Sequence, residues 1–293
     1  MSLTLIAPAL IVVAIGLVLA YLHPPMRPSA EARLLCTYAT VAGLTGFTIL
    51  FALTAGLVSR TDLGSLIVSA CPALPIGHGV GLVEGLVGSA LLVAGSARFG
   101  LTLRQRRRLS RATGGRRFAV IDSSQPTAFA VPGQPGCVVV SRGLLDRVTP
   151  QQRRVVLAHE QAHLRHRHHR HLLAGEFVTS FVPILRPLAA RIRLVTELAA
   201  DQSAVSAIGN DAGLVARTIE TVAALTSSPS SAVPAFGGSA IDARLAALWA
   251  PPLGPGRRMT GRLAGISALL LVVATATTQA HHLAEAVWHI CGM

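Results

Sequence analysis

Two histidines and a glutamate have the clearest chemistry in this sequence. His159, Glu160 and His163 stand in the order His-Glu-Gln-Ala-His. Residues four apart on an α-helix lie one turn apart on the same face, so both imidazoles would point to one side and share a Zn²⁺ ion. Glu160 follows the first histidine directly, where its carboxylate can take a proton from a metal-bound water molecule. The spacing therefore predicts one Zn²⁺ per chain, with Glu160 as the catalytic general base.

A catalytic zinc site needs a third protein ligand and an open position for water. Glu197 is the candidate ligand, and Asp201 follows it four residues later on the same predicted helix face. Asp201 would orient one of the ligand imidazoles from behind. The alternative is a solvated acidic face. Because the chain has only 13 acidic residues, a pair at this spacing in an alanine-rich helix favours the metal site.

More histidines follow the motif. His166, His168, His169 and His171 alternate with arginines. A tract of this composition can bind metal nonspecifically. We interpret it as a continuation of the helix that forms a cationic surface near the membrane, and we keep only His168 as a candidate for the site.

Local signals predict the elements that position these residues. Thr149, Pro150 and Gln152 form the start of a helix with a capping box, and this helix continues through the histidine motif. Residues 118–140 read as short strands, with a turn at 132–136. Such a hairpin either presents an edge strand to an extended peptide or packs on the helices, and the pattern alone allows both.

The composition is that of a membrane protein. Hydrophobic residues make up 51% of the chain and charged residues 13%, against about a quarter in soluble proteins. Mean hydropathy is +0.55. Four stretches are long and apolar enough to cross a bilayer, namely 3–22, 37–58, 80–97 and 263–280. We therefore expect a mostly α membrane protein with four transmembrane helices.

Arginines set the expected orientation of these spans. The formal net charge is +13, and seven arginines lie close together after the third span: Arg104, Arg106, Arg107, Arg108, Arg111, Arg116 and Arg117. Cytoplasmic loops carry such excesses. We expect a multi-pass protein of the plasma membrane with both termini outside, a three-helix region at 1–100, a cytoplasmic domain at 101–262, and the fourth helix with a short outer tail at 263–293. No nucleic-acid-binding module is recognisable, so direct binding of nucleic acid is not expected.

Two further features bear on this topology. The apolar stretch 172–188 contains two prolines and two charged residues, so we expect it to be interfacial or packed against the spans rather than a fifth crossing. The expected orientation places Cys71 and Cys291 on the oxidising side, where either a disulfide or two free thiols would fit.

These motifs resemble the gluzincin membrane peptidases, in particular the BlaR/MecR type of antirepressor-regulating peptidase. The similar segments are 126–133, 138–145, 156–168, 197–201 and 242–245. The resemblance covers about residues 118 to 248 and implies an α+β gluzincin-type metallopeptidase domain between spans three and four. It also implies zinc ligands His159, His163 and Glu197. His168 and Arg244 are the candidates for contacting an oxyanion or the substrate.

The function expected from the resemblance is a membrane-bound zinc endopeptidase that cleaves a protein substrate, such as a transcriptional repressor, in a signalling pathway. HtpX-like quality-control peptidases share the motifs and are one alternative. A non-catalytic membrane sensor with a structural metal site is another, although the chain keeps Glu160. The BlaR/MecR sensors carry a large extracytoplasmic domain after the last span, whereas this sequence ends at Met293, so no such domain is expected. The sequence leaves open whether the protein forms a homo-oligomer.

Overall fold

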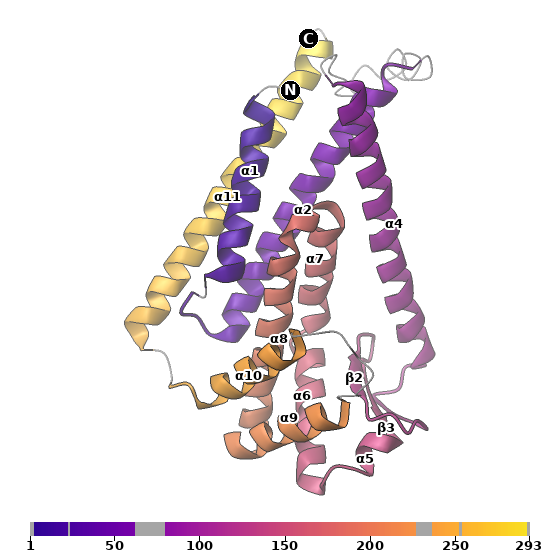
Figure 1. The fold of residues 1–293 in the computed structure, drawn as a ribbon, viewed down its shortest axis with the longest axis vertical. Helices are drawn as coiled ribbons and strands as arrows, with labels where there is room; N and C mark the ends of the chain where they lie inside the picture. The colour runs from indigo at the N-terminus through magenta and orange to yellow at the C-terminus, as the bar shows by residue number, and fades with distance from the viewer. Residues whose placement is uncertain (1–2, 23, 62–79, 227–235, 252–253, 292–293) are drawn as a thin grey trace.

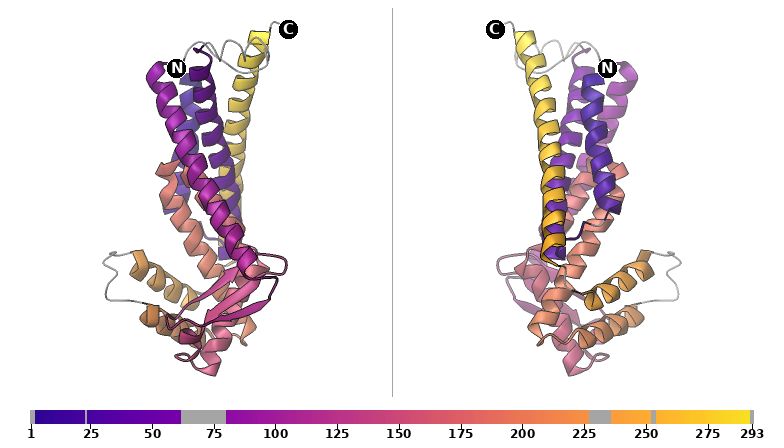
Figure 2. Two further views of the ribbon diagram at one scale, coloured as in Figure 1. Left: turned by 90° about the vertical axis from the view of Figure 1, so that its right-hand side faces the viewer. Right: turned by 90° about the vertical axis from the view of Figure 1, so that its left-hand side faces the viewer.

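The computed structural model describes residues 3–22, 24–61, 80–226, 236–251 and 254–291. Long helices run side by side along the long axis of the molecule, and shorter helices and a small sheet gather at one end (Figures 1 and 2). The long helices are α1 (Leu3–Tyr21), α2 (Pro28–Val58), α4 (Leu82–Ala112) and α11 (Pro255–Cys291). The shorter ones are α5 (Arg142–Leu145), α6 (Pro150–Arg165), α7 (His168–Phe181), α8 (Arg186–Ala207), α9 (Ala212–Thr226) and α10 (Phe236–Trp249), with the 3-10 turn η1 (Pro183–Leu185) between α7 and α8.

Three helices in the described part of the chain are long and apolar enough to cross a membrane: Pro28–Val58, Leu82–Ala112 and Pro255–Thr278. The expected first span forms α1, whose apolar stretch Ala9–Tyr21 is shorter. On α4, large apolar side chains such as Leu86 and Val93 are more than half exposed. An unpartnered apolar helix surface of this kind is typical of contact with lipid. The structure thus supports membrane association through three of the four expected spans.

The expected domain boundaries fall within continuous helices. α4 runs from the third apolar stretch into the arginine segment without a break, and α11 begins before residue 263 and continues to Cys291. Division of the chain at residues 100 and 262 therefore stays a prediction. Among the described residues, Cys36 and Cys137 are free thiols. Cys71 lies outside the described residues, as does the side chain of Cys291, so their pairing also stays a prediction.

Residues 172–188, the stretch expected to be interfacial or packed against the spans, form the end of a helical hairpin made by α7 and α8. In this hairpin α7 packs against α2 and α4, and α8 packs against α2 and α1 (Figure 1). Glycines permit the close approach, since a Cβ added to Gly95 of α4 would lie 2.5 Å from the carbonyl oxygen of Ser180. An ion pair with little exposure joins α2 to α8, in which Arg191 Nε donates to Glu31 Oε1 at 2.8 Å.

The sheet is three-stranded and places one strand at an edge beside α6. The strands are β1 (Phe118–Ile121), β2 (Ala128–Val131) and β3 (Cys137–Ser141). They occupy the stretch expected to form strands, and β2 and β3 flank the expected turn. The fully buried β3 lies in the centre, antiparallel to β2 and parallel to β1. β2 is therefore an edge strand that also contacts α6, so both interpretations of the hairpin stay open.

α6 begins as its sequence predicts and ends earlier than expected. The capping box is formed, with the backbone N–H of Gln152 donating to Thr149 Oγ1 at 3.2 Å and that of Thr149 donating to Gln152 Oε1 at 3.0 Å. The expected continuation through the histidine tract is wrong, because α6 ends at Arg165. Arg167 then adopts the left-handed conformation, with φ 54° and ψ 39°. A new helix, α7, starts at His168.

Candidate metal centre

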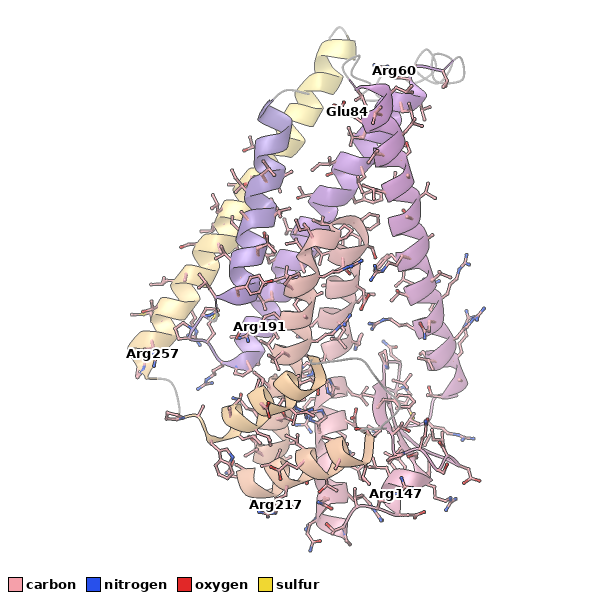
Figure 3. All side chains as sticks on the ribbon, viewed as in Figure 1. Arg60, Glu84, Arg147, Arg191, Arg217 and Arg257 are labelled. Carbon is pink, nitrogen blue, oxygen red and sulfur yellow. The ribbon has the colours of Figure 1, made fainter. Side chains whose placement is uncertain are left out.

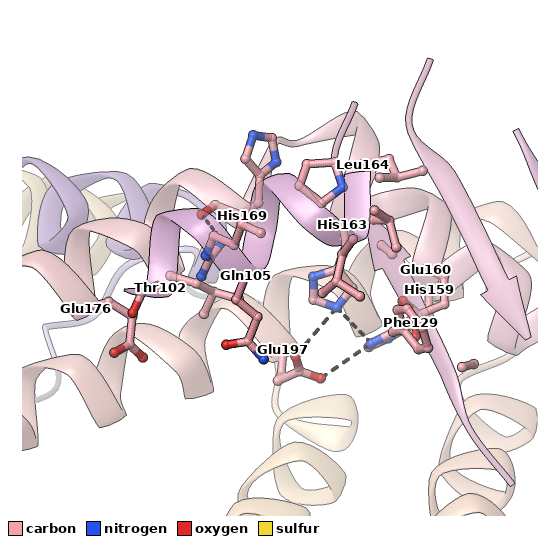
Figure 4. A pocket seen from close by; sticks show the side chains of 17 residues that line it. Thr102, Gln105, Phe129, His159, Glu160, His163, Leu164, His169, Glu176 and Glu197 are labelled. Atoms are coloured by element: carbon pink, nitrogen blue, oxygen red, sulfur yellow. Dashed lines mark hydrogen bonds and ion pairs between the residues drawn. The ribbon is translucent and has the colours of Figure 1, made fainter. Parts of the chain in front are cut away.

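α6 and α8 bring three potential ligands to one point. The Nε2 atoms of His159 and His163 lie 3.1 Å apart, and the Glu197 carboxylate oxygens lie 3.4 Å and 3.5 Å from them (Figure 4). Tetrahedral Zn²⁺ with ligands at about 2.0–2.1 Å requires ligand atoms about 3.3 Å apart. The donor set and its spacing therefore fit a zinc ion.

Small side chains set the distance between the two helices. Ala162 of α6 and Ala200 and Ala204 of α8 are fully buried. Val155 of α6 packs in one cluster with Ala204 and with Val215 of α9. Since α6 and α8 pack directly against each other, a carboxylate on α8 reaches the imidazoles on α6.

Asp201 lies behind His159, on the side away from the other ligands. Its Oδ1 atom is 2.9 Å from His159 Nδ1, and its side chain is only 2% exposed. Arg244 of α10 binds the same carboxylate through two donors, Nε at 2.8 Å and Nη2 at 2.7 Å. A carboxylate held in this way fixes the imidazole with Nε2 facing the metal position. Arg244 Nη1 also lies 3.4 Å from Glu197.

Charges at the centre favour a bound cation. Burial lowers the pKa of His159, but the carboxylates of Asp201 and Glu197 outweigh this effect and raise it to about 10. Burial raises the pKa of Glu197, but His159, His163 and Arg244 lower it to about 2. The carboxylates of Asp201 and Glu197 therefore stabilise a positive charge at His159. A metal ion bound to this imidazole would be stabilised in the same way.

The other two groups have the protonation states that the chemistry requires. Burial lowers the pKa of His163 to about 4, so this ligand is a neutral imidazole at neutral pH. Burial raises the pKa of Glu160 to about 6, close to the range in which a general base is most effective. The backbone of Ala130 in β2 acts in the opposite direction and lowers the pKa of Glu160, and both residues line the same cavity.

Two cavities flank the centre and meet at it. The larger, of about 660 Å³, lies between α4, β2, α6 and α7, and its lining includes Thr102, Gln105 and Arg106 of α4. The second, of about 410 Å³, is lined mainly by aliphatic residues of α6, α9 and α10 and by Arg244. Both include Ala128, Phe129, His159, Glu160 and Glu197. Together they form a path along β2 that crosses the metal position.

His168 does not lie where an oxyanion or substrate contact would have to be. It is 2% exposed and lines neither cavity, and its Nδ1 atom is 3.1 Å from His163 Nδ1. The histidine tract is therefore not a single cationic surface. His168 is buried, whereas His169 lines the larger cavity. Arg244, the other candidate, does line the second cavity.

Sequence reasoning missed the contribution of α4 to the site. The arginine-rich end of this helix was interpreted only as a topology anchor, yet Thr102, Gln105 and Arg106 form a wall of the larger cavity. Arg106 Nη1 also donates to the carbonyl oxygen of His169 at 3.2 Å. No local pattern signals this role, because it depends on where α4 packs relative to α7.

Comparison with known proteins supports a peptidase interpretation of the central part of the chain. No solved structure matches this chain. Residues 104–227 match the profile of Peptidase family M48. This segment includes β2, α6 and α8, with all three potential metal ligands, whereas Arg244 lies beyond it. The match therefore indicates a metallopeptidase domain, in a chain whose apolar helices associate it with a membrane.

Proposed function

We propose that the protein is a membrane-bound, zinc-dependent endopeptidase that cleaves a protein substrate on the cytoplasmic side. The observation that carries this proposal is the convergence of His159, His163 and Glu197 beside the edge strand, with Glu160 between two cavities. These three residues would hold the ion, which when bound supplies Lewis-acid activation of the scissile carbonyl and of a water molecule.

The protein's own groups perform the remaining steps. The edge of β2 pairs with the backbone of an extended substrate and fixes its direction across the site. Glu160 takes a proton from the attacking water molecule and passes it to the leaving amine. Asp201 keeps the imidazole of His159 oriented throughout. Arg244 is the candidate for stabilising the oxyanion, because it lines the second cavity within 3.4 Å of Glu197.

The two cavities support cleavage within a chain rather than at its end. The path along β2 continues on both sides of the metal position, so it accommodates substrate residues before and after the scissile bond. The aliphatic lining of the smaller cavity suits a large apolar side chain. On the analogy with BlaR/MecR peptidases, the proposed substrate is a transcriptional repressor.

A second candidate function is quality control of membrane proteins, as in HtpX-like peptidases. The observation that favours it is the wall that α4 contributes to the larger cavity. Because α4 is one of the candidate membrane spans, a segment leaving the bilayer would reach the site directly. The two functions differ in their products, since one yields fragments of a soluble DNA-binding protein and the other yields fragments of membrane proteins.

Comparison of the purified wild type with Glu160→Gln tests the proposed activity. We expect equal zinc content, because Glu160 is not a ligand, and a loss of about 10²–10⁴-fold in cleavage of fluorescently labelled casein. Glu220→Gln is the matched control, because Glu220 is exposed on α9 and should leave both properties unchanged. Undiminished cleavage by Glu160→Gln, or a wild type without zinc, would contradict the proposal. Proteomes of cells expressing each variant would then distinguish a repressor from membrane proteins.

A further inference from the structure

The second nitrogen of His163 has a partner of its own. Its Nε2 atom faces His159 and Glu197, whereas its Nδ1 atom lies 3.1 Å from Nδ1 of His168. The two rings meet edge to face, with centroids 4.9 Å apart and planes at 85°. Two imidazole nitrogens at this distance share one hydrogen atom, so one ring donates and the other accepts.

Metal binding would decide which ring donates. A nitrogen that binds a metal does so through its lone pair, so His163 would carry its hydrogen on Nδ1 and donate it to His168. We propose that His168 is a positioning residue that accepts this hydrogen bond and thereby fixes the tautomer and ring orientation of His163. The inference rests on the zinc site of the proposed function. His168 would serve His163 as Asp201 serves His159, but with a neutral acceptor.

The break between α6 and α7 creates this contact. In an uninterrupted helix, a residue five positions after His163 would lie about 140° away around the axis. The left-handed conformation of Arg167 ends α6 and starts a new helix, which returns the next side chain to His163. The rings of His166 and His171 flank His168, with centroids 5.6 Å and 5.7 Å away. The buried ring is thus held from several sides.

Two other roles for His168 do not fit its position. As a fourth metal ligand, it would have to approach the Nε2 side of His163, but it lies on the Nδ1 side. Among the described residues, the group able to hold a metal comprises His159, His163 and Glu197 only. As a substrate contact, His168 would have to line a cavity at the site, and it lines neither.

Zinc affinity tests the inference without relying on activity. His168→Leu removes the acceptor, and we expect zinc affinity, measured by chelator competition, to fall about 10–100-fold. His168→Asn places an amide oxygen near the former Nδ1 position and should recover most of this affinity. Glu220→Gln is the control, because Glu220 is exposed on α9 and belongs to neither the histidine cluster nor the ligand set. Wild-type affinity in His168→Leu, or equal losses in the Leu and Asn variants, would overturn the inference.

A measurement on the wild type covers the case in which a variant does not fold. Nitrogen-15 NMR of histidine-labelled, zinc-loaded protein in detergent should show His163 protonated at Nδ1 and His168 unprotonated at Nδ1. The opposite assignment would overturn the inference. A wild type that binds zinc with this tautomer but cleaves nothing would refute the proposed activity and leave the role of His168 intact.

Discussion

At the scale of single residues, the two proposed histidine ligands have different partners on their second ring nitrogen. His159 faces a buried carboxylate that is itself bound by Arg244, whereas His163 faces a buried imidazole. A charged acceptor strengthens the basicity of its ligand more than a neutral one does. With an acceptor on the Nδ1 side of each ring, as proposed, the two Nε2 atoms would be left for the metal ion.

Asp201→Asn should weaken the metal site while leaving its shape intact. The amide is isosteric with the carboxylate but removes the negative charge that both His159 and Arg244 engage. We expect zinc affinity to fall about 10–100-fold. Asp211→Asn is the matched control, because Asp211 Oδ1 accepts from the backbone N–H of Leu214 at the start of α9 and asparagine makes the same cap. Unchanged zinc affinity in Asp201→Asn would show that the carboxylate does not support His159.

At the scale of elements, the α7–α8 hairpin connects the long helices to the candidate metal centre. α7 begins at His168, and α8 carries Glu197 and Asp201. The far end of the hairpin packs against α1, α2 and α4. The relative position of the ligands therefore depends on how the hairpin fits between the long helices.

A matched pair of substitutions on α4 tests this fit. The Cβ of Gly95→Ala would lie 2.5 Å from the carbonyl oxygen of Ser180, a backbone atom that cannot rotate away. We expect overpacking to destabilise the protein by about 1–3 kcal/mol. Gly100→Ala meets no atom within 4 Å and should stabilise the helix by about 0.5–1 kcal/mol. Thermal unfolding in detergent, followed by circular dichroism, measures both. Equal midpoints would show that the hairpin does not pack against α4 at this position.

Elements with strong local signals could be predicted from the sequence, and elements defined by tertiary contacts could not. The strands and the cap of α6 depend on β-branched residues, turn residues and a capping box within a few positions. The potential ligands follow from helical spacing alone. The break at Arg167 has no such signal, because arginine does not favour the left-handed conformation. The position of His168 and the role of α4 follow from packing, which no local pattern encodes.

At the scale of the whole molecule, the site lies where the long helices meet the sheet. Arg147 and Arg217 lie at the end that holds the sheet and short helices, and Arg60 and Glu84 lie at the opposite end (Figure 3). The arginine-rich end of α4 lies on the side of the sheet. An excess of arginine retains a segment in the cytoplasm, so the sheet and the metal centre are expected on that side.

Single cysteines at the two ends test this orientation. We expect Arg60→Cys, in a background without the four native cysteines, to react with a membrane-impermeant maleimide in intact cells. Arg147→Cys should react only after permeabilisation, because Arg147 is expected on the cytoplasmic side. Both positions are exposed on the protein, so the expected difference in labelling comes from the side of the membrane alone. The cysteine-free parent should remain unlabelled under both conditions. The reverse pattern would place Glu160 and the metal ligands outside the cell, where no transcriptional repressor could reach them.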